Sequence, residues 1–240
     1  MGERTKKFPR RVLLAIFFLC GCAADQSKVQ DGAAPRDAVP APVFREGDFW
    51  RFTVTEQSDE PLTRTDTVHG DYELSYSGGK FTLSKLAGGR KTEVYVYSGE
   101  TLVDAEFTPA EFLSLLDHQR VWAFIQFPLY VGKMWKTSYR ALGKDDMTLL
   151  FSISAQTRVT GIEKIATAAG NLEAFKIERE ASLSATLGRG VPHGITMWHH
   201  YVYYYSPETR TIVKYNSLRE GDRRPINRRS IELIGWSRAK

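Results

Sequence analysis

The chain has 240 residues, of which 42% are hydrophobic, 12% aromatic and 25% charged. This is an ordinary globular composition, and it excludes collagen-like, low-complexity and wholly disordered chains. Lys and Arg outnumber Asp and Glu by 33 to 28, a formal net charge of +5. Residues 1–21 hold five basic side chains and one acidic side chain, which is +4 of this total. The remainder is close to neutral, so the charge gives no indication of a nucleic-acid partner.

The N-terminus has the order of segments that is typical of a secretory signal peptide. A basic start is followed by an apolar run from Val12 to Cys20, about half of the roughly 20 residues that a transmembrane helix needs. Leu19-Cys20-Gly21-Cys22 resembles the bacterial lipobox, which implies cleavage before Cys22 and lipidation of Cys22 on its thiol and amine. The residue directly after Cys22 is Ala23 and not Asp, and in the bacterial lipoproteins that this pattern resembles, this implies an outer-membrane destination. A buried helix or an ordinary cleaved signal is the alternative.

The sequence is therefore predicted to have three parts. Residues 1–21 are the predicted lipoprotein signal peptide. Residues 22–43 contain three prolines and no aromatic side chain, so they cannot bury enough apolar surface to order themselves and are predicted to be a disordered tether. Residues 44–240 are the predicted β-rich domain. The chain has only two cysteines, Cys20 and Cys22, so this domain must fold without a disulfide.

Alternation with a period of two dominates the domain. Trp50, Phe52 and Val54 alternate with polar residues, and the longest such pattern runs over residues 147–159. Glycine pairs mark tight hairpin turns, and Ser206-Pro207-Glu208-Thr209 predicts a turn between two further strands. The prediction is a mostly β fold: a single curved antiparallel sheet, forming an open half-barrel or a partly closed barrel, with one short helix.

The helix is predicted over residues 109–117. Thr108-Pro109-Ala110-Glu111 combines an N-cap, a proline at the first helical position and a capping-box glutamate. Phe112, Leu115 and Leu116 then follow at helical spacing. A connector packed on the sheet and a lid over a cavity are both open roles for it.

Two short segments of the chain are similar to each other. Gly47-Asp48-Phe49-Trp50-Arg51 and Gly132-Lys133-Met134-Trp135-Lys136 share a glycine, a tryptophan three residues later and then a basic residue. Each segment opens a predicted strand. The similarity raises the hypothesis of an internal duplication.

No catalytic or metal-binding motif is present in the sequence. Zinc-protease, nucleophile-elbow and phosphate-loop patterns are all missing. His199 and His200 are adjacent on a predicted strand and therefore point to opposite faces. Glu178, Glu180 and Lys176 indicate a charge-balanced surface. We expect no enzyme activity, no cofactor and no metal.

Two groups of residues are candidate binding sites. The aromatic candidates for an apolar or carbohydrate ligand are Trp135, Trp198, Tyr201 and Tyr203, with core packing as the alternative. On the predicted strand Trp198 faces the opposite side from Tyr201 and Tyr203. The candidates for an anion contact, such as lipid phosphate, lie in one basic segment and are Arg223, Arg224, Arg228 and Arg229. A solvated hairpin is the alternative for this second group.

The C-terminal half carries a family resemblance. The segments are 127–135 (FPLYVGKMW), 159–177 (VTGIEKIATAAGNLEAFKI) and 205–215 (YSPETRTIVKY). They resemble an uncharacterised family of proteobacterial periplasmic proteins and lipoproteins, distantly similar to lipoprotein-carrier proteins. The resemblance implies a half-barrel-like domain and supplies no catalytic residue. This chain departs from the pattern at Ala168, where Pro is usual, and at Arg210, where Gly is common.

These features predict a lipid-anchored periplasmic protein of the outer membrane with a non-catalytic binding or envelope-assembly role. The expected partners are the membrane, through the N-terminal lipid, and a hydrophobic or envelope-derived ligand or an envelope protein. A structural or protein-interaction scaffold is the first alternative. An uncharacterised hydrolase is the second, and it would need a polar cluster with shifted pKa values in a cleft.

Overall fold

The computed structural model describes residues 34–58, 66–98, 125–142, 149–187, 191–221 and 224–239. Within these ranges the only extended regular elements are ten β-strands, and no helix there is long and apolar enough to cross a membrane. The signal peptide, most of the tether and the helix predicted over residues 109–117 lie outside the described residues. The strands are β1 (Phe49–Ser58), β2 (Asp66–Ser77), β3 (Lys80–Ala87), β4 (Arg90–Ser98), β5 (Met134–Leu142), β6 (Leu149–Thr167), β7 (Gly170–Leu187), β8 (Val191–Ser206), β9 (Thr211–Gly221) and β10 (Arg224–Ser237).

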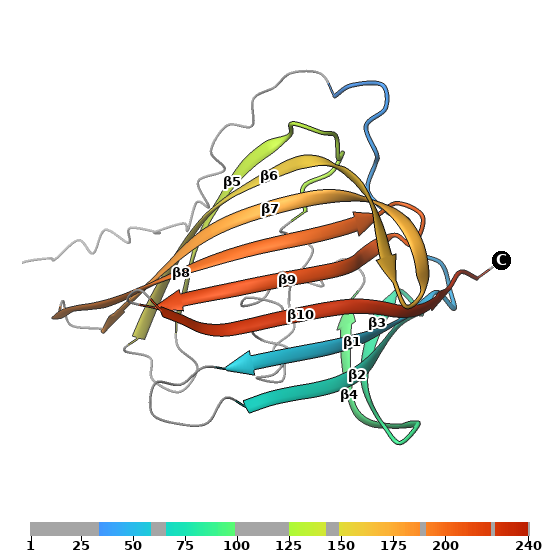
Figure 1. Ribbon diagram of the computed structural model, residues 1–240, viewed down its shortest axis with the longest axis horizontal. Helices are drawn as coiled ribbons and strands as arrows, with labels where there is room; N and C mark the ends of the chain where they lie inside the picture. The colour runs from blue at the N-terminus through green and yellow to red at the C-terminus, as the bar shows by residue number, and fades with distance from the viewer. Residues whose placement is uncertain are drawn as a thin grey trace, which may run out of the picture.

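All ten strands form one antiparallel sheet in the order β4-β3-β2-β1-β10-β9-β8-β7-β6-β5 (Figure 1). Every neighbouring pair is consecutive in the chain except β1 and β10, which join near the middle of the sheet. The order is therefore that of an up-and-down meander whose first and last strands pair and whose opening lies between β4 and β5. The predicted single curved sheet is confirmed, and it stays open.

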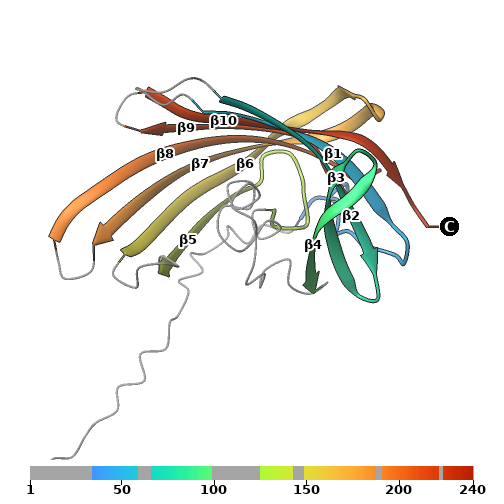
Figure 2. The ribbon, with the colours of Figure 1, turned by 90° about the horizontal axis from the view of Figure 1, so that it is seen from below.

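The sheet is strongly curved, as Figure 2 shows from below. On β1 the alternation behaves as predicted, since Trp50, Phe52 and Val54 are buried on the concave face. The segments before β1 and β5 lie on this face, where Val39 and Leu129 exchange backbone hydrogen bonds of 2.8 and 2.7 Å. The concave face is thus the hydrophobic core, and the opposite, outer face carries the polar residues of the same strands.

Strand β1 begins at a tight corner. Gly47 has φ of 84°, a left-handed conformation that favours glycine. Its N–H donates to the Tyr76 carbonyl at 3.0 Å, and the Tyr76 N–H donates to the Asp48 carbonyl at 2.8 Å. Asp48 is fully buried, and Trp50, three residues after the glycine, is 2% exposed.

Strand β5 begins at a corner of the same construction. Gly132 has φ of 91°, its N–H donates to the Val159 carbonyl at 2.9 Å, and the Val159 N–H donates to the Lys133 carbonyl at 2.9 Å. Lys133 and Trp135 are buried, as Asp48 and Trp50 are. The similarity between the two sequence segments is therefore confirmed as a repeated local structure.

The hairpin between β8 and β9 forms at the predicted turn. Arg210 follows the turn with φ of 60°, and its N–H donates to the Ser206 carbonyl at 2.8 Å. This explains why glycine suits the position, because side chains rarely adopt that conformation. The Arg210 guanidinium lies 3.3 Å from the Asp48 carboxylate and donates to the Val43 carbonyl at 2.6 Å. The hairpin is thereby fastened to the corner of β1.

Candidate functional site

A polar row crosses the buried concave face from β5 to β10. Direct cross-strand register runs from Trp135 through Thr157, Arg179, Tyr201 and Ser217 to Arg229, and we call this set the arginine row. All six share one face, because residues directly opposite each other in a sheet point the same way. Arg179 is fully buried and Arg229 is 4% exposed. Two cations are therefore held inside the arch.

Tyrosines surround the middle of this row. The Tyr201 ring stacks on Tyr203 with centroids 5.9 Å apart, and both rings contact Tyr215 at 6.1 and 5.1 Å. The Arg179 guanidinium lies 5.6 Å from the centroid of Tyr201, which stabilises a buried cation through the ring quadrupole. The Tyr201 hydroxyl also forms a 2.8 Å hydrogen bond with Nδ1 of His199.

Three of the four aromatic candidates lie on this concave face. Trp135, Tyr201 and Tyr203 are 2–4% exposed there. Trp198 is 61% exposed, since it stands at the other parity of β8 and points away from the core. The four residues therefore do not line one surface, and Trp198 belongs to the outer face.

The predicted anion-contact arginines do not form one patch either. Arg228 is exposed on the outer face, whereas Arg229 is buried in the arginine row on the opposite face. Arg224 opens β10 opposite Gly221, and Arg223 lies outside the described residues. Sequence analysis missed Arg179, although its parity with Ile177 and Ala181 already places it on the apolar side of β7.

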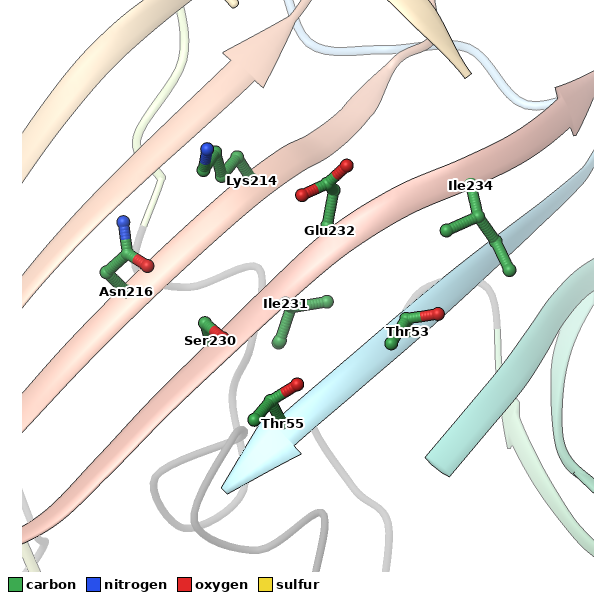
Figure 3. A pocket seen from close by; sticks show the side chains of 8 residues that line it. All are labelled: Thr53, Thr55, Lys214, Asn216, Ser230, Ile231, Glu232 and Ile234. Atoms are coloured by element: carbon green, nitrogen blue, oxygen red, sulfur yellow. The ribbon is translucent and has the colours of Figure 1, made fainter. Parts of the chain in front are cut away.

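The outer face has a hollow of its own across β9, β10 and β1, and a second hollow adjoins it toward β8. The first has a volume of about 450 Å³, and Figure 3 shows the eight side chains that line it. The second has a volume of about 330 Å³. The two share three lining residues, Thr55, Asn216 and Ser230, so they form one continuous depression that we call the outer trough.

Strand register explains the shape of the outer trough. Its floor is a cross-strand row of short side chains, namely Thr55, Ser230, Asn216 and Val202. On one side stands a row with longer side chains, Glu232 and Lys214, together with Thr53. On the other side stand Gln57, Arg228, Leu218 and His200. Rows two residues apart are about 6.6 Å apart along the strands, so the flanking rows stand about 13 Å from each other.

On the outer face of β6 and β7, Lys176 lies between two carboxylates, one of them the predicted partner Glu178. The Lys176 ammonium lies 3.3 Å from the Glu178 carboxylate and 3.6 Å from that of Glu163. The hydrogen bond to Glu178 raises the pKa of Lys176, with a further contribution from the charge of Glu163. These contacts are those of an exposed ion-pair network.

The described residues bring no metal-ligand set together. No group of three or more His, Cys, Asp and Glu side chains that could hold an ion occurs among them. His199 stacks on Tyr201 on the concave face while His200 is exposed on the outer face, so the predicted opposition of the two histidines is confirmed. The chemistry these surfaces offer is hydrogen bonding, aromatic contact and charge.

Comparison with known proteins gives distant structural neighbours. No family model matches the sequence, and no curated protein matches it significantly. The chain is similar to a candidate lipoprotein from Parabacteroides distasonis, at 15% identity and a TM-score of 0.37 over 84% of this chain and all of that one. It is also similar to a candidate exported protein of YmcC-like fold from Bacteroides fragilis, at 13% identity and a TM-score of 0.34, again over 84% of this chain and all of that one.

The hypothetical lipoprotein YmcC from Escherichia coli matches at 9% identity and a TM-score of 0.39, over 79% of this chain and 85% of that one. All three neighbours are described as lipoproteins or exported proteins. Their TM-scores are too low to carry an argument about the function of this chain. Membership of a specifically proteobacterial family and similarity to lipoprotein carriers stay predictions.

Proposed function

We propose that this chain is a lipoprotein of the bacterial envelope, anchored through Cys22 to the periplasmic face of the outer membrane, with a non-catalytic binding role. The anchor rests on the Leu19-Cys20-Gly21-Cys22 pattern and on the absence of any other cysteine from the sequence. On this proposal the chain between Cys22 and Val39, where the backbone pairs with Leu129 of the folded body, keeps that body close to the membrane.

The observation that carries the binding role is the aromatic concave face of an open sheet. Tyr201, Tyr203 and Tyr215 make a continuous ring surface, and the edge strands β4 and β5 leave the arch open on one side. Apolar sheet faces are covered by the protein itself or by a partner molecule. A hydrophobic or envelope-derived ligand on this face is the occupant we propose.

A scaffold role without a small ligand is the second candidate, and one observation favours it. Val159, Ile177 and Tyr203 form the next cross-strand row, and they are only 0–3% exposed. Packing of this density leaves no room for a ligand at that row. On this alternative the outer face, and not the concave face, contacts an envelope partner.

The anchor and the ligand are tested separately with the full chain expressed in a Gram-negative host. Metabolic labelling with a fatty-acid analogue should modify the wild type and not Cys22→Ser, which should leave the membrane fraction. Labelling of Cys22→Ser would contradict the anchor. Native mass spectrometry of the wild type in detergent, with solvent extraction, should reveal a co-purifying hydrophobic molecule. Its absence from several preparations would contradict the ligand and favour the scaffold.

A further inference from the structure

We propose that the outer trough is a binding site for an uncharged, hydroxyl-rich oligosaccharide. The proposal concerns the face opposite the aromatic core, so it is independent of any ligand on the concave face. Four observations support it: the shape of the trough, the chemistry of its floor, its small accessible net charge and an exposed aromatic side chain beside it.

The shape is that of a channel running across the strands. The floor row spans β8, β9, β10 and β1, and three interstrand spacings correspond to a length of about 14 Å. Figure 3 shows Glu232 and Lys214 next to each other along one flank of the hollow, beside the shorter Ser230 and Asn216. An extended chain lying across the sheet fits this form better than a compact molecule does.

The floor offers hydrogen-bonding groups that can both donate and accept. Ser230 contributes a hydroxyl and Asn216 an amide, and neither side chain makes a hydrogen bond within the part of the chain that the structure describes. Thr55 adds a hydroxyl that already pairs with Nδ1 of His69 at 3.1 Å. Sugar hydroxyls likewise donate and accept, so they complement such a floor.

The charges and apolar groups of the trough also fit a neutral sugar. Lys214, Arg228 and Arg229 are the cationic side chains of the lining and Glu232 is the anionic one, but Arg229 is only 4% exposed. The accessible excess is therefore a single positive charge, too little for strong binding of an anion. Val202 and Leu218 supply an apolar strip in the second hollow. A pyranose ring presents C–H groups as well as hydroxyls, and this mixed lining accommodates both.

Trp198 provides the aromatic contact. It lies on the outer face of β8, two residues before His200, and thus about 6.6 Å along the strand from the edge of the trough. It is 61% exposed, and it is the one aromatic residue among the strongly exposed large hydrophobic residues of the described chain. An exposed indole ring beside a polar channel is available to stack on the apolar face of a sugar.

A peptide is a poorer occupant of the same channel. Peptides that bind sheets commonly add a strand to an exposed edge, using unpaired backbone groups. The trough instead lies over β10, β9 and β1, whose backbones are paired on both sides, and it crosses them. Main-chain pairing is therefore not offered to a ligand at this site.

The test uses the full chain in detergent on an array of neutral and acidic oligosaccharides. The strongest neutral binder is then titrated against the wild type, Asn216→Ala, Ser230→Ala and Trp198→Ala. The matched control is Asn171→Ala, because Asn171 is an exposed amide on β7 outside the trough. Melting curves establish that each variant is folded.

We expect a neutral oligosaccharide to bind, with affinity about tenfold lower for Asn216→Ala and for Ser230→Ala, the loss from one hydrogen bond. Trp198→Ala should lower affinity and remove most of the ligand-induced change in tryptophan fluorescence. Asn171→Ala should bind as the wild type does. Absence of any neutral binder, binding of acidic glycans alone, or equal affinity in Asn216→Ala and Asn171→Ala would each overturn the proposal.

Discussion

The indole Nε1 of Trp50 donates a 2.7 Å hydrogen bond to the carbonyl of Thr209, which lies 159 residues further along the chain. Trp50 is the second residue of β1, and Thr209 lies in the turn between β8 and β9. Both residues are at most 2% exposed, so water cannot replace the partner of either group. This bond and the ion pair between Asp48 and Arg210 hold together segments from opposite ends of the sequence.

Trp50→Phe tests how much the hydrogen bond from Trp50 to Thr209 contributes to the free energy of unfolding. The substitution keeps an aromatic ring in the core but leaves the buried carbonyl of Thr209 without its donor, which should lower the free energy of unfolding by about 1–3 kcal/mol. Urea denaturation of the full chain gives this value. Trp198→Phe is the control, since Trp198 is mostly exposed, and it should change stability by less than about 0.5 kcal/mol. Equal losses of stability in the two variants would show that the hydrogen bond to Thr209 does not stabilise the fold.

A second prediction concerns Glu73 and pH. Its carboxylate is partly buried on β2, between Arg51 and Lys91, each with a nitrogen 2.8 Å away. Burial alone would raise the pKa of Glu73, but the hydrogen bonds from Lys91 and Arg51 outweigh it and hold the pKa below 4.5. Since the folded state releases this proton more readily than the unfolded state, the stabilisation is complete above pH 4.5 and is lost as pH falls through the folded pKa.

Glu73→Gln should therefore lower the free energy of unfolding by about 1 kcal/mol at pH 7, and the difference from the wild type should shrink at more acidic pH. Denaturation at a series of pH values measures this. Glu173→Gln serves as the control, because Glu173 is exposed on β7. A difference that stayed constant down to pH 3 would contradict the assignment of the effect to the carboxylate charge.

Much of the fold was accessible from local sequence patterns. Alternation predicted that Trp50, Phe52 and Val54 share a buried face, and the turn at residues 206–209 predicted the pairing of β8 with β9. Such signals involve neighbours in the chain. The pairing of β1 with β10 could not be predicted in this way, because it joins the two ends of the domain and contains a bulge between Arg51 and Phe52.

The same limit applies to the candidate sites. The aromatic residue type is enough to select Trp135, Tyr201 and Tyr203 as candidate ligand-binding residues. Alternation along β8 is enough to place Trp198 on the opposite face of the strand from the two tyrosines. The outer trough depends on Thr55 standing opposite Ser230, which follows only from the register between β1 and β10. Reading Arg228 and Arg229 as one basic group overlooked that adjacent strand residues face opposite sides of a sheet.

The two glycine corners predict matched effects of substitution. Gly47 and Gly132 have φ of 84° and 91°, and a Cβ at Gly132 would meet no atom within 4 Å, so the constraint there is conformational, not steric. Gly47→Ala and Gly132→Ala should each cost about 1–2 kcal/mol of stability. Gly161→Ala is the control, since Gly161 has an ordinary φ and open space around it, and it should be close to neutral. Thermal unfolding of the three variants measures this, and equal losses in all three would refute the conformational argument.

At the start of β5, Trp135 should contribute much more to the stability of the fold than its neighbour Met134 does. Its ring is 4% exposed, and the buried Lys133 ammonium lies 5.6 Å from the ring centroid while it donates to the carbonyls of Gln126 and Pro128. Trp135→Ala removes the ring and opens a cavity, so the free energy of unfolding should fall by about 3–5 kcal/mol. Met134 is the neighbouring side chain on the outer face and is 48% exposed, so Met134→Ala should change stability by less than about 0.5 kcal/mol. Because both variants truncate a side chain of the same strand, similar midpoints in urea for the two would mean that the ring of Trp135 does not support the concave core.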